Sequence, residues 1–154
     1  MSKATIRPLA FVERQDPDTG ARVQRLTPTD VTCHRTYFYQ KCFTNDGAKL
    51  VFGAQFGEHW NYHLLDLQAQ TATQLSDQAG ENTFGGFLSP DDQHLYFVRA
   101  ERQLIRLDIR TLQEDVVYQV PPEWVGYGTW VANSACTKMV GIEILATDWF
   151  ALTD

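Results

Sequence analysis

A polar turn followed by a short apolar strand recurs three times along this chain of 154 residues. The turns begin at Thr44, Ser89 and Asn133, so they are 45 and then 44 residues apart. The apolar segments that follow them lie at 50–52, 95–97 and 139–141. A repeat of about 40–50 residues that contains several short strands is the signature of a β-propeller blade. The spacing therefore predicts an all-β protein built of propeller blades.

Each full repeat is predicted to hold four antiparallel strands, because runs of β-branched and aromatic residues are separated by Gly, Asn and Asp. The strands of the first repeat are expected at 37–43, 49–55, 61–67 and 71–75, and those of the second at 84–88, 94–100, 103–109 and 115–120. Asp66 and Asp108 end the third strand of each repeat, between two apolar residues. Both carboxylates are expected to accept backbone hydrogen bonds in the turn that follows.

The whole chain is predicted to be a single incomplete propeller domain over residues 1–154. It would consist of a half blade at about 5–27, two full blades at about 34–76 and 82–120, and a half blade at about 126–154. The first half blade is expected to be a hairpin of the segments 9–14 and 22–26, the outer strands of a blade whose inner strands lie elsewhere. Closed propellers need about four to eight blades. The expected partners are therefore the remaining blades of a larger propeller, or further copies of the chain, because open blade faces and strand edges favour self-association.

The composition excludes several classes of function. A net charge of −6 argues against a general nucleic-acid binder, which needs a broad basic surface. No apolar stretch is long enough for a membrane span, and the first residues lack the apolar core of a signal peptide. The three cysteines, Cys33, Cys42 and Cys136, have no paired or metal-type spacing and are expected to be reduced. The expected location is therefore the cytoplasm, with the periplasm as the alternative if the N-terminus is trimmed.

Candidate binding residues follow from the place of the loops in a propeller. Ligands bind near the central axis, on the face where the loops between blades meet the loops between the second and third strands of a blade. From these loops we take as candidate substrate-binding residues His34, Arg35, His59, Trp60, Asn82 and Tyr127.

His34 and Arg35 stand at the entry to an inner strand, where their side chains are expected to point into the axial funnel. Two cations suit an anionic ligand, and the fork of Arg35 suits a carboxylate because it can bind both oxygens. The alternative is structural: Arg35 would pair with a neighbouring carboxylate, and His34 would cap a turn. For His59 and Trp60 the alternative is a packed hairpin tip.

Other chemistry has no support in the sequence. His63 and His94 lie within expected strands, and four scattered histidines without close spacing do not predict a metal site. The chain has no G-x-S-x-G elbow, no P-loop and no dinucleotide-binding fingerprint. Spacing alone therefore predicts no reaction.

Four stretches of the chain resemble one family closely, the oligogalacturonate lyases. These stretches are 34–47, 59–62, 82–92 and 123–133, and the resemblance covers nearly the whole chain from about Arg25 onward. It is far more specific than the Ser-Pro-Asp turn at 89–91, which many propellers share. His34 and Arg35 match the N-terminal motif of the family, whereas their role as substrate contacts rests on loop position.

The resemblance implies a seven-bladed propeller enzyme of bacterial pectin catabolism. Such enzymes split short galacturonate oligomers, often the disaccharide, by β-elimination: a base removes the proton on C5, the neighbouring carboxylate carries the developing negative charge, and the C4 oxygen leaves. A divalent metal, usually manganese, helps to bind the substrate and to stabilise that charge. The metal ligands and the catalytic histidine and arginine of the family belong to later blades. No catalytic and no metal-binding residue is therefore assigned to this chain, and we expect the span alone to lack lyase activity.

Two other functions stay open at this point. The chain could belong to a non-catalytic propeller module that binds ligands or proteins, or to a truncated remnant without activity. A weaker alternative is the propeller of a serine peptidase, which would need a hydrolase domain downstream.

Overall fold

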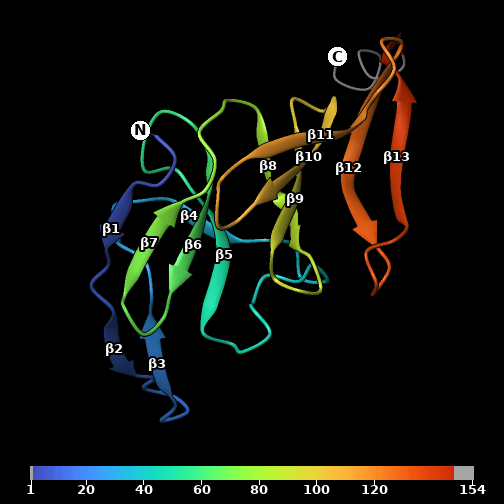
Figure 1. Ribbon diagram of the computed structural model, residues 1–154. Helices are drawn as coiled ribbons and strands as arrows, with labels where there is room; N and C mark the ends of the chain where they lie inside the picture. Colours follow the sequence, from blue (N-terminus) through green and yellow to red (C-terminus); the bar gives the residue numbers. More distant parts are fainter. Residues whose placement is uncertain (1, 148–154) are drawn as a thin grey trace.

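A computed structural model describes residues 2–147, and these residues form mainly antiparallel β-sheets (Figure 1). The strands are β1 (Ile6–Pro8), β2 (Val12–Gln15), β3 (Arg22–Arg25), β4 (Cys33–Arg35), β5 (Lys49–Ala54), β6 (Asn61–Asp66), β7 (Thr71–Gln74), β8 (Glu81–Leu88), β9 (His94–Arg99), β10 (Gln103–Asp108), β11 (Glu114–Gln119), β12 (Trp124–Ala132) and β13 (Met139–Leu145).

The larger sheets stand side by side as successive blades (Figure 1). The first has the order β1-β7-β6-β5-β4, and the second has the order β11-β10-β9-β8. The innermost strand, β4 or β8, precedes the other strands of its blade in the sequence, except that β1 joins the first blade from upstream. A further pair, β12 and β13, follows beyond the second blade and contacts β8 and β9 through β12.

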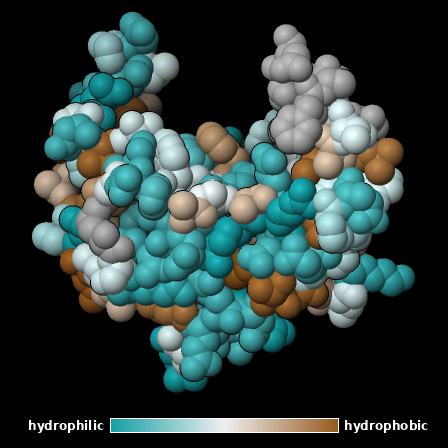
Figure 2. Space-filling model, turned by 90° about the horizontal axis from the view of Figure 1, so that it is seen from above, coloured by the Kyte–Doolittle hydropathy of each residue, from teal (hydrophilic) through white to brown (hydrophobic). Residues whose placement is uncertain are grey.

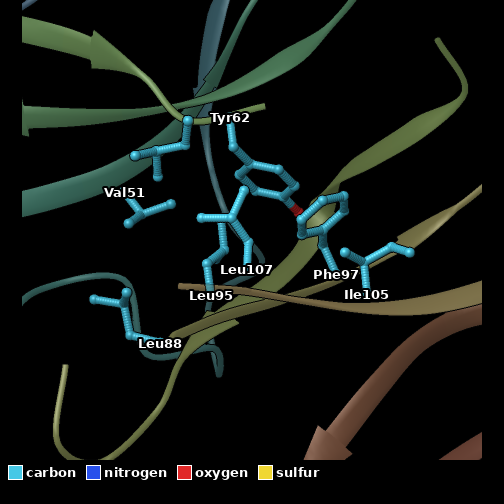
Figure 3. Close-up of a cluster of buried hydrophobic side chains, with 8 residues drawn as sticks. Val51, Tyr62, Leu88, Leu95, Phe97, Ile105 and Leu107 are labelled. Atoms are coloured by element: carbon cyan, nitrogen blue, oxygen red, sulfur yellow. The ribbon is translucent and has the colours of Figure 1, made fainter. Parts of the chain in front are cut away.

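A hydrophobic core joins the first two blades (Figure 3). Val51 and Tyr62 from the first sheet meet Leu95, Phe97 and other apolar side chains of the second, and the rings of Tyr62 and Phe97 lie 5.0 Å apart. Each fully buried apolar side chain of this size contributes about 1.5–3 kcal/mol. The opposite face of the first sheet carries a second cluster around Phe52 and Leu65, because alternate residues of a strand point to opposite sides.

The recurring turn has the same physical cause in each repeat. The side-chain oxygens of Thr44, Ser89 and Asn133 accept a hydrogen bond from the backbone N–H five residues further on, at 3.0, 2.9 and 2.9 Å. The backbone N–H of each of these residues donates to the carbonyl of that same partner, at 3.0, 2.8 and 3.0 Å. A short polar side chain at the first position thus closes the hairpin, and this requirement explains the period in the sequence.

The prediction for Asp66 and Asp108 is confirmed. One carboxylate oxygen of Asp66 accepts from the N–H groups of the residues two and three positions on, at 3.1 and 2.8 Å. Asp108 does the same at 2.9 and 2.7 Å. Both residues cap the turn between the third and fourth strands of their blade.

The predicted inner strand at 37–43 is wrong over residues 37–41. The inner strand is β4, which ends at Arg35, and residues 37–40 form a turn in which the Gln40 N–H donates to the Tyr37 carbonyl at 2.9 Å. The Tyr37 N–H donates instead to Phe84 of the next blade, at 2.7 Å, and the buried Gln40 amide donates to Trp130 of the pair beyond, at 2.8 Å. Residues 37–41 therefore leave the sheet, and the chain returns to β5 only at its end, where the Cys42 carbonyl accepts from the Val51 N–H at 2.8 Å and Phe43 pairs with Leu50.

The inner strands of the following sheets, β8 and β12, are also irregular part-way along their length. The register of β8 against β9 shifts between Asn82 and Phe87, and that of β12 against β13 shifts between Tyr127 and Val131. The irregular segments contact one another, because the Tyr39 hydroxyl lies 2.6 Å from that of Thr129. The inner strands therefore bond to each other around the axial side of the blades.

The N-terminal segment is arranged differently from the expectation. The predicted hairpin is present as β2 and β3, which form a small sheet of their own. The residues before it form β1, which pairs antiparallel with β7, so that the first blade gains a fifth strand at its outer edge. Between residues 2 and 147 no helix is long and apolar enough to cross a membrane.

The surface is mixed, with hydrophobic patches at the margins. Hydrophilic residues cover most of the face seen in Figure 2, and hydrophobic residues gather along its edges. On the last strand pair, Val140 is 71% and Ile142 58% exposed. An apolar sheet face of this kind is ordinarily covered by another part of a protein.

Candidate functional site

His34 lies on β4, the innermost strand of the first blade, and its ring nitrogens both have partners. Nδ1 is 3.0 Å from the Arg35 carbonyl oxygen, and Nε2 is 3.0 Å from the Thr83 hydroxyl. Because a carbonyl oxygen can only accept, we infer that Nδ1 carries the proton and that Nε2 accepts from Thr83. Burial lowers the pKa of His34, and the hydrogen bond to the Arg35 carbonyl opposes this only in part. The ring is therefore neutral at pH 7 and connects β4 to β8.

Aromatic rings pack against His34 from two other elements. The ring of Phe84 is parallel to it, and the ring of Trp60 lies 4.6 Å away at an interplanar angle of 39°. The residue opposite His34 on β5 is Gly53, where a Cβ atom would stand 2.7 Å from His34 and 2.8 Å from Thr83. Only glycine leaves room for the ring here. His34, Trp60, Thr83 and Phe84 form one group, which we call the His34 cluster.

Arg35 points away from the His34 cluster. It follows His34 directly on β4 and is opposite Phe52, so its side chain lies on the other face of the sheet. The side chain is exposed, and its guanidinium has no hydrogen-bond or ion-pair partner among residues 2–147. The two cations predicted to act side by side are therefore separated. The free guanidinium remains suited to a carboxylate.

Asn82 holds inner strands together. Its side-chain oxygen accepts from the N–H groups of Phe84 and Gly85, both at 3.2 Å, and its amide donates to the Gly128 carbonyl at 3.3 Å. Its own carbonyl accepts from the buried Tyr62 hydroxyl at 2.6 Å. The side chain is half-buried, and these bonds position the start of β8 next to His34.

The hairpin between β5 and β6 carries the next two candidates. His59 is exposed at its tip, and Trp60 is half-buried against His34. Asn61, the first residue of β6, is buried and fixes the end of this hairpin. The structure thus brings Trp60 and His34 together, places Asn82 directly before Thr83 of the same cluster, and leaves His59 in solvent.

Tyr127 lies on a different surface. It is 51% exposed on β12, opposite Ile142, and it lines a shallow groove with Val140 and the aromatic turn at 37–39. The sequence reasoning missed this turn as a surface feature. A signal was available, because three successive aromatic residues cannot all face the same side of a strand.

The described residues offer no site for a metal ion. No three His, Cys, Asp or Glu side chains of residues 2–147 gather closely enough to hold one. His63 is buried, with its Nδ1 3.1 Å from the Asn61 carbonyl, and His94 lies half-buried on β9. This part of the chain therefore does not fit a manganese site.

Comparison with known proteins gives one consistent result. A family model described as oligogalacturonate lyase matches residues 1–154. The chain is 63% identical to the oligogalacturonide lyase of Pectobacterium atrosepticum and 62% identical to the oligogalacturonate lyase of Dickeya dadantii, over 154 residues in both cases. All of the chain is matched, and it spans 40% of the length of each relative.

Solved structures agree with the sequence relatives. An oligogalacturonate lyase in complex with manganese superimposes on the whole chain with a TM-score of 0.96 at 65% identity, and the match covers 41% of that protein. An oligogalacturonate lyase from Vibrio parahaemolyticus gives 0.95 at 54% identity, over 99% of this chain and 40% of that one. TolB from Acinetobacter baumannii, at 15% identity and a TM-score of 0.52, shares the fold alone.

Proposed function

The chain belongs to the oligogalacturonate lyase family, and on this premise we propose that the full-length protein cleaves short galacturonate oligomers, digalacturonate among them, by β-elimination. The observation that carries the proposal is the match of the whole chain to a manganese-bound oligogalacturonate lyase at a TM-score of 0.96. In this reaction a base takes the C5 proton, the uronate carboxylate bears the developing charge, and the C4 oxygen leaves. Manganese would help to stabilise that charge. Residues 2–147 contain no group of side chains that could hold the ion. Its ligands would therefore come from outside these residues.

The share of this chain in the proposed reaction is substrate binding. Arg35 offers an exposed guanidinium without a partner among residues 2–147, and such a group binds both oxygens of a carboxylate. Trp60 offers a partly exposed indole that His34 holds in place. His59, Asn82 and Tyr127 stay candidates for contacts with the substrate or with the loops around it.

The experiment is a lyase assay on the full-length protein with digalacturonate and Mn²⁺. The proposal expects a rise in absorbance from the unsaturated uronate product, and no rise would refute it. Arg35→Ala should raise KM for digalacturonate about tenfold or more, because a charged hydrogen bond contributes about 1.5–3 kcal/mol. Unchanged kinetics would remove Arg35 from the binding site.

A non-catalytic binding module is the alternative, and the same protein distinguishes it. Binding of digalacturonate measured by calorimetry without any product would favour that alternative. The proposed cytoplasmic location is supported by the three cysteines, which are all free thiols.

A further inference from the structure

The carboxylate of Glu81 is completely buried. Glu81 is the first residue of β8, directly before Asn82 and Thr83, and its side chain is 0% exposed. A buried charge is costly unless it is paired and hydrogen-bonded. The surroundings of this carboxylate therefore need an explanation.

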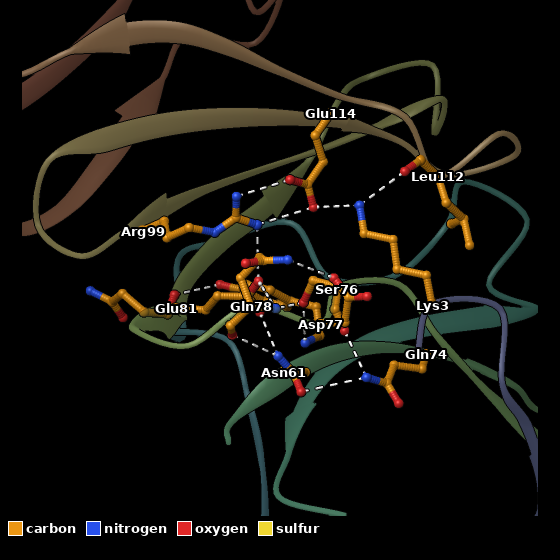
Figure 4. A network of polar contacts seen from close by, with 12 residues as sticks. Lys3, Asn61, Gln74, Ser76, Asp77, Gln78, Glu81, Arg99, Leu112 and Glu114 are labelled. Carbon is orange, nitrogen blue, oxygen red and sulfur yellow. Dashed lines mark hydrogen bonds and ion pairs between the residues drawn. The ribbon is translucent and has the colours of Figure 1, made fainter. Parts of the chain in front are cut away.

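The carboxylate binds two loops at once (Figure 4). One oxygen accepts from the Ser76 hydroxyl and from the Asn61 side chain, the latter at 3.1 Å. The other oxygen accepts from Arg99 at 3.1 Å and from the Gln78 N–H at 3.4 Å. Asn61 ends the hairpin that carries Trp60, whereas Ser76 and Gln78 belong to the connection between the blades. These are the two kinds of loop that border the axial face.

The Asn61 side chain completes this junction. Its amide also donates to the Gln78 carbonyl at 3.0 Å. Ser76 uses its hydroxyl oxygen to accept from the Tyr62 N–H at 2.9 Å. The connection between blades and the start of β6 are thus held together by these bonds and by those that both segments make to Glu81.

Charged groups of alternating sign extend from Glu81 to the N-terminal segment. Arg99 binds Glu81 on one side and Glu114 on the other, with Glu114 contacts of 2.9 and 3.0 Å. Lys3 then binds Glu114 at 2.7 Å. Burial raises the pKa of Glu81, and the bonds from Ser76, Asn61 and Arg99 act against this effect.

A buried ion pair is weak evidence for stability, because desolvation can exceed the attraction gained. Its geometry is informative in another way, since the bonds of Glu81 to Asn61, Ser76 and Gln78 fix two loops that carry or adjoin the His34 cluster. We propose that Glu81 is a positioning residue of the binding site: its carboxylate holds the inter-blade connection against the start of β6 and so sets where Trp60 and Thr83 meet His34. Only the kinetic part of its test rests on the proposed function.

The test is Glu81→Gln in the full-length protein, followed by hydrogen–deuterium exchange with mass spectrometry. The glutamine side chain has the same size as that of glutamate. Its NH₂ group, however, cannot accept the hydrogen bonds that Ser76, Asn61 or Arg99 donate to the carboxylate. Peptides that cover residues 56–61 and 76–84 should exchange about tenfold faster, while peptides from β9 and β10 should stay protected. KM for digalacturonate should rise about tenfold with a smaller change in kcat.

A matched control and a milder variant keep the test decisive. Arg106→Gln removes the exposed pair of Arg106 with Asp115 and should leave exchange and kinetics unchanged. If Glu81→Gln does not fold, Ser76→Ala removes one donor to the same carboxylate and should shift the same peptides less.

Three results for Glu81→Gln would overturn the proposal. Both loops could exchange at the wild-type rate, or exchange could become faster evenly over all blades. Exchange could also become faster in the loops while KM for digalacturonate stays at the wild-type value. If the wild-type protein cleaves nothing, the proposed function fails, and the exchange experiment still decides whether Glu81 positions the loops.

Discussion

The rings of His34 and Phe84 stack face to face, with centroids 3.7 Å apart and planes 4° apart. The two residues are 50 positions apart in the sequence and belong to the inner strands of neighbouring blades. With both ring nitrogens occupied and the ring neutral, His34 connects the blades and is not an available cation. In the proposed enzyme the recognition of a uronate carboxylate then depends on Arg35.

The first prediction concerns Gly53, which leaves room for the His34 ring that stacks on Phe84. Gly53→Ala should destabilise the protein by about 1–3 kcal/mol, because the new Cβ would overlap with His34 and Thr83. Urea unfolding at pH 7 measures the change. The same substitution in a His34→Ala background should cost less, since one of the two clashes is gone. An equal cost in both backgrounds would show that the ring does not set the space at Gly53.

The repeat predicts the blades because its cause is local. Thr44, Ser89 and Asn133 each cap their own hairpin within five residues, and Asp66 and Asp108 cap theirs within three. Interactions of this range leave a pattern that can be seen in the sequence. Except for the inner strand expected at 37–43, the strands that these turns join therefore lie close to their predicted places.

The inner strand and the His34 cluster depend on distant contacts, and here the sequence was insufficient. Tyr37 leaves the first sheet because its N–H binds Phe84, and Gln40 is fixed by Trp130, 90 residues away. Strand alternation also separates Arg35 from His34, which adjacency in the sequence could not reveal once the strand had been placed at 37–43. The candidate residues were drawn from the correct loops, but their grouping required the fold.

The second prediction concerns pH. Burial next to Phe52 and Phe56 lowers the pKa of His63 from 6.5 to about 4, and the positive charge of Arg7 acts in the same direction. Between these two pH values the unfolded chain binds a proton that the native state does not bind, so stability falls as the pH falls from about 6.5 to 4. The contribution amounts to about 3 kcal/mol.

The variant His63→Gln isolates this effect, because glutamine has no charge at any pH. Urea unfolding of both proteins at pH 7, 5.5 and 4.5 should show that the free energy of unfolding falls more steeply with decreasing pH in the wild type. An equal decrease in the two proteins would mean that His63 is not responsible for the pH dependence.

The third prediction concerns the contact between consecutive turns. Asp92 binds Lys41 at 2.5 Å and the Asn45 N–H at 2.7 Å, and it ties the turn of the first blade to that of the second. Asp92→Ala removes both bonds and leaves alanine at a φ of 61°, where non-glycine residues are strained. We expect a loss of about 2 kcal/mol in urea unfolding.

The control for Asp92 is Glu13→Ala in the N-terminal hairpin. Glu13 and Arg22 also form an ion pair at 2.5 Å, but both side chains are largely exposed. Exposed pairs contribute little, so this variant should stay within about 0.5 kcal/mol of the wild type. Equal losses from the two variants would contradict a special role for the contact between the turns.

The fourth prediction concerns manganese. A ligand that binds only the native state raises the free energy of unfolding by an amount that grows with the ligand concentration relative to Kd. A ligand concentration of about 100 times Kd adds about 2.7 kcal/mol. The residues from 2 to 147 bring no three metal-ligating side chains together, whereas an oligogalacturonate lyase of the same fold has been solved with manganese. Mn²⁺ should therefore raise the Tm of the full-length protein, and EDTA should reverse the rise. The same titration should leave the Tm of the 154-residue chain unchanged, and a saturable rise in that chain would place metal ligands within it.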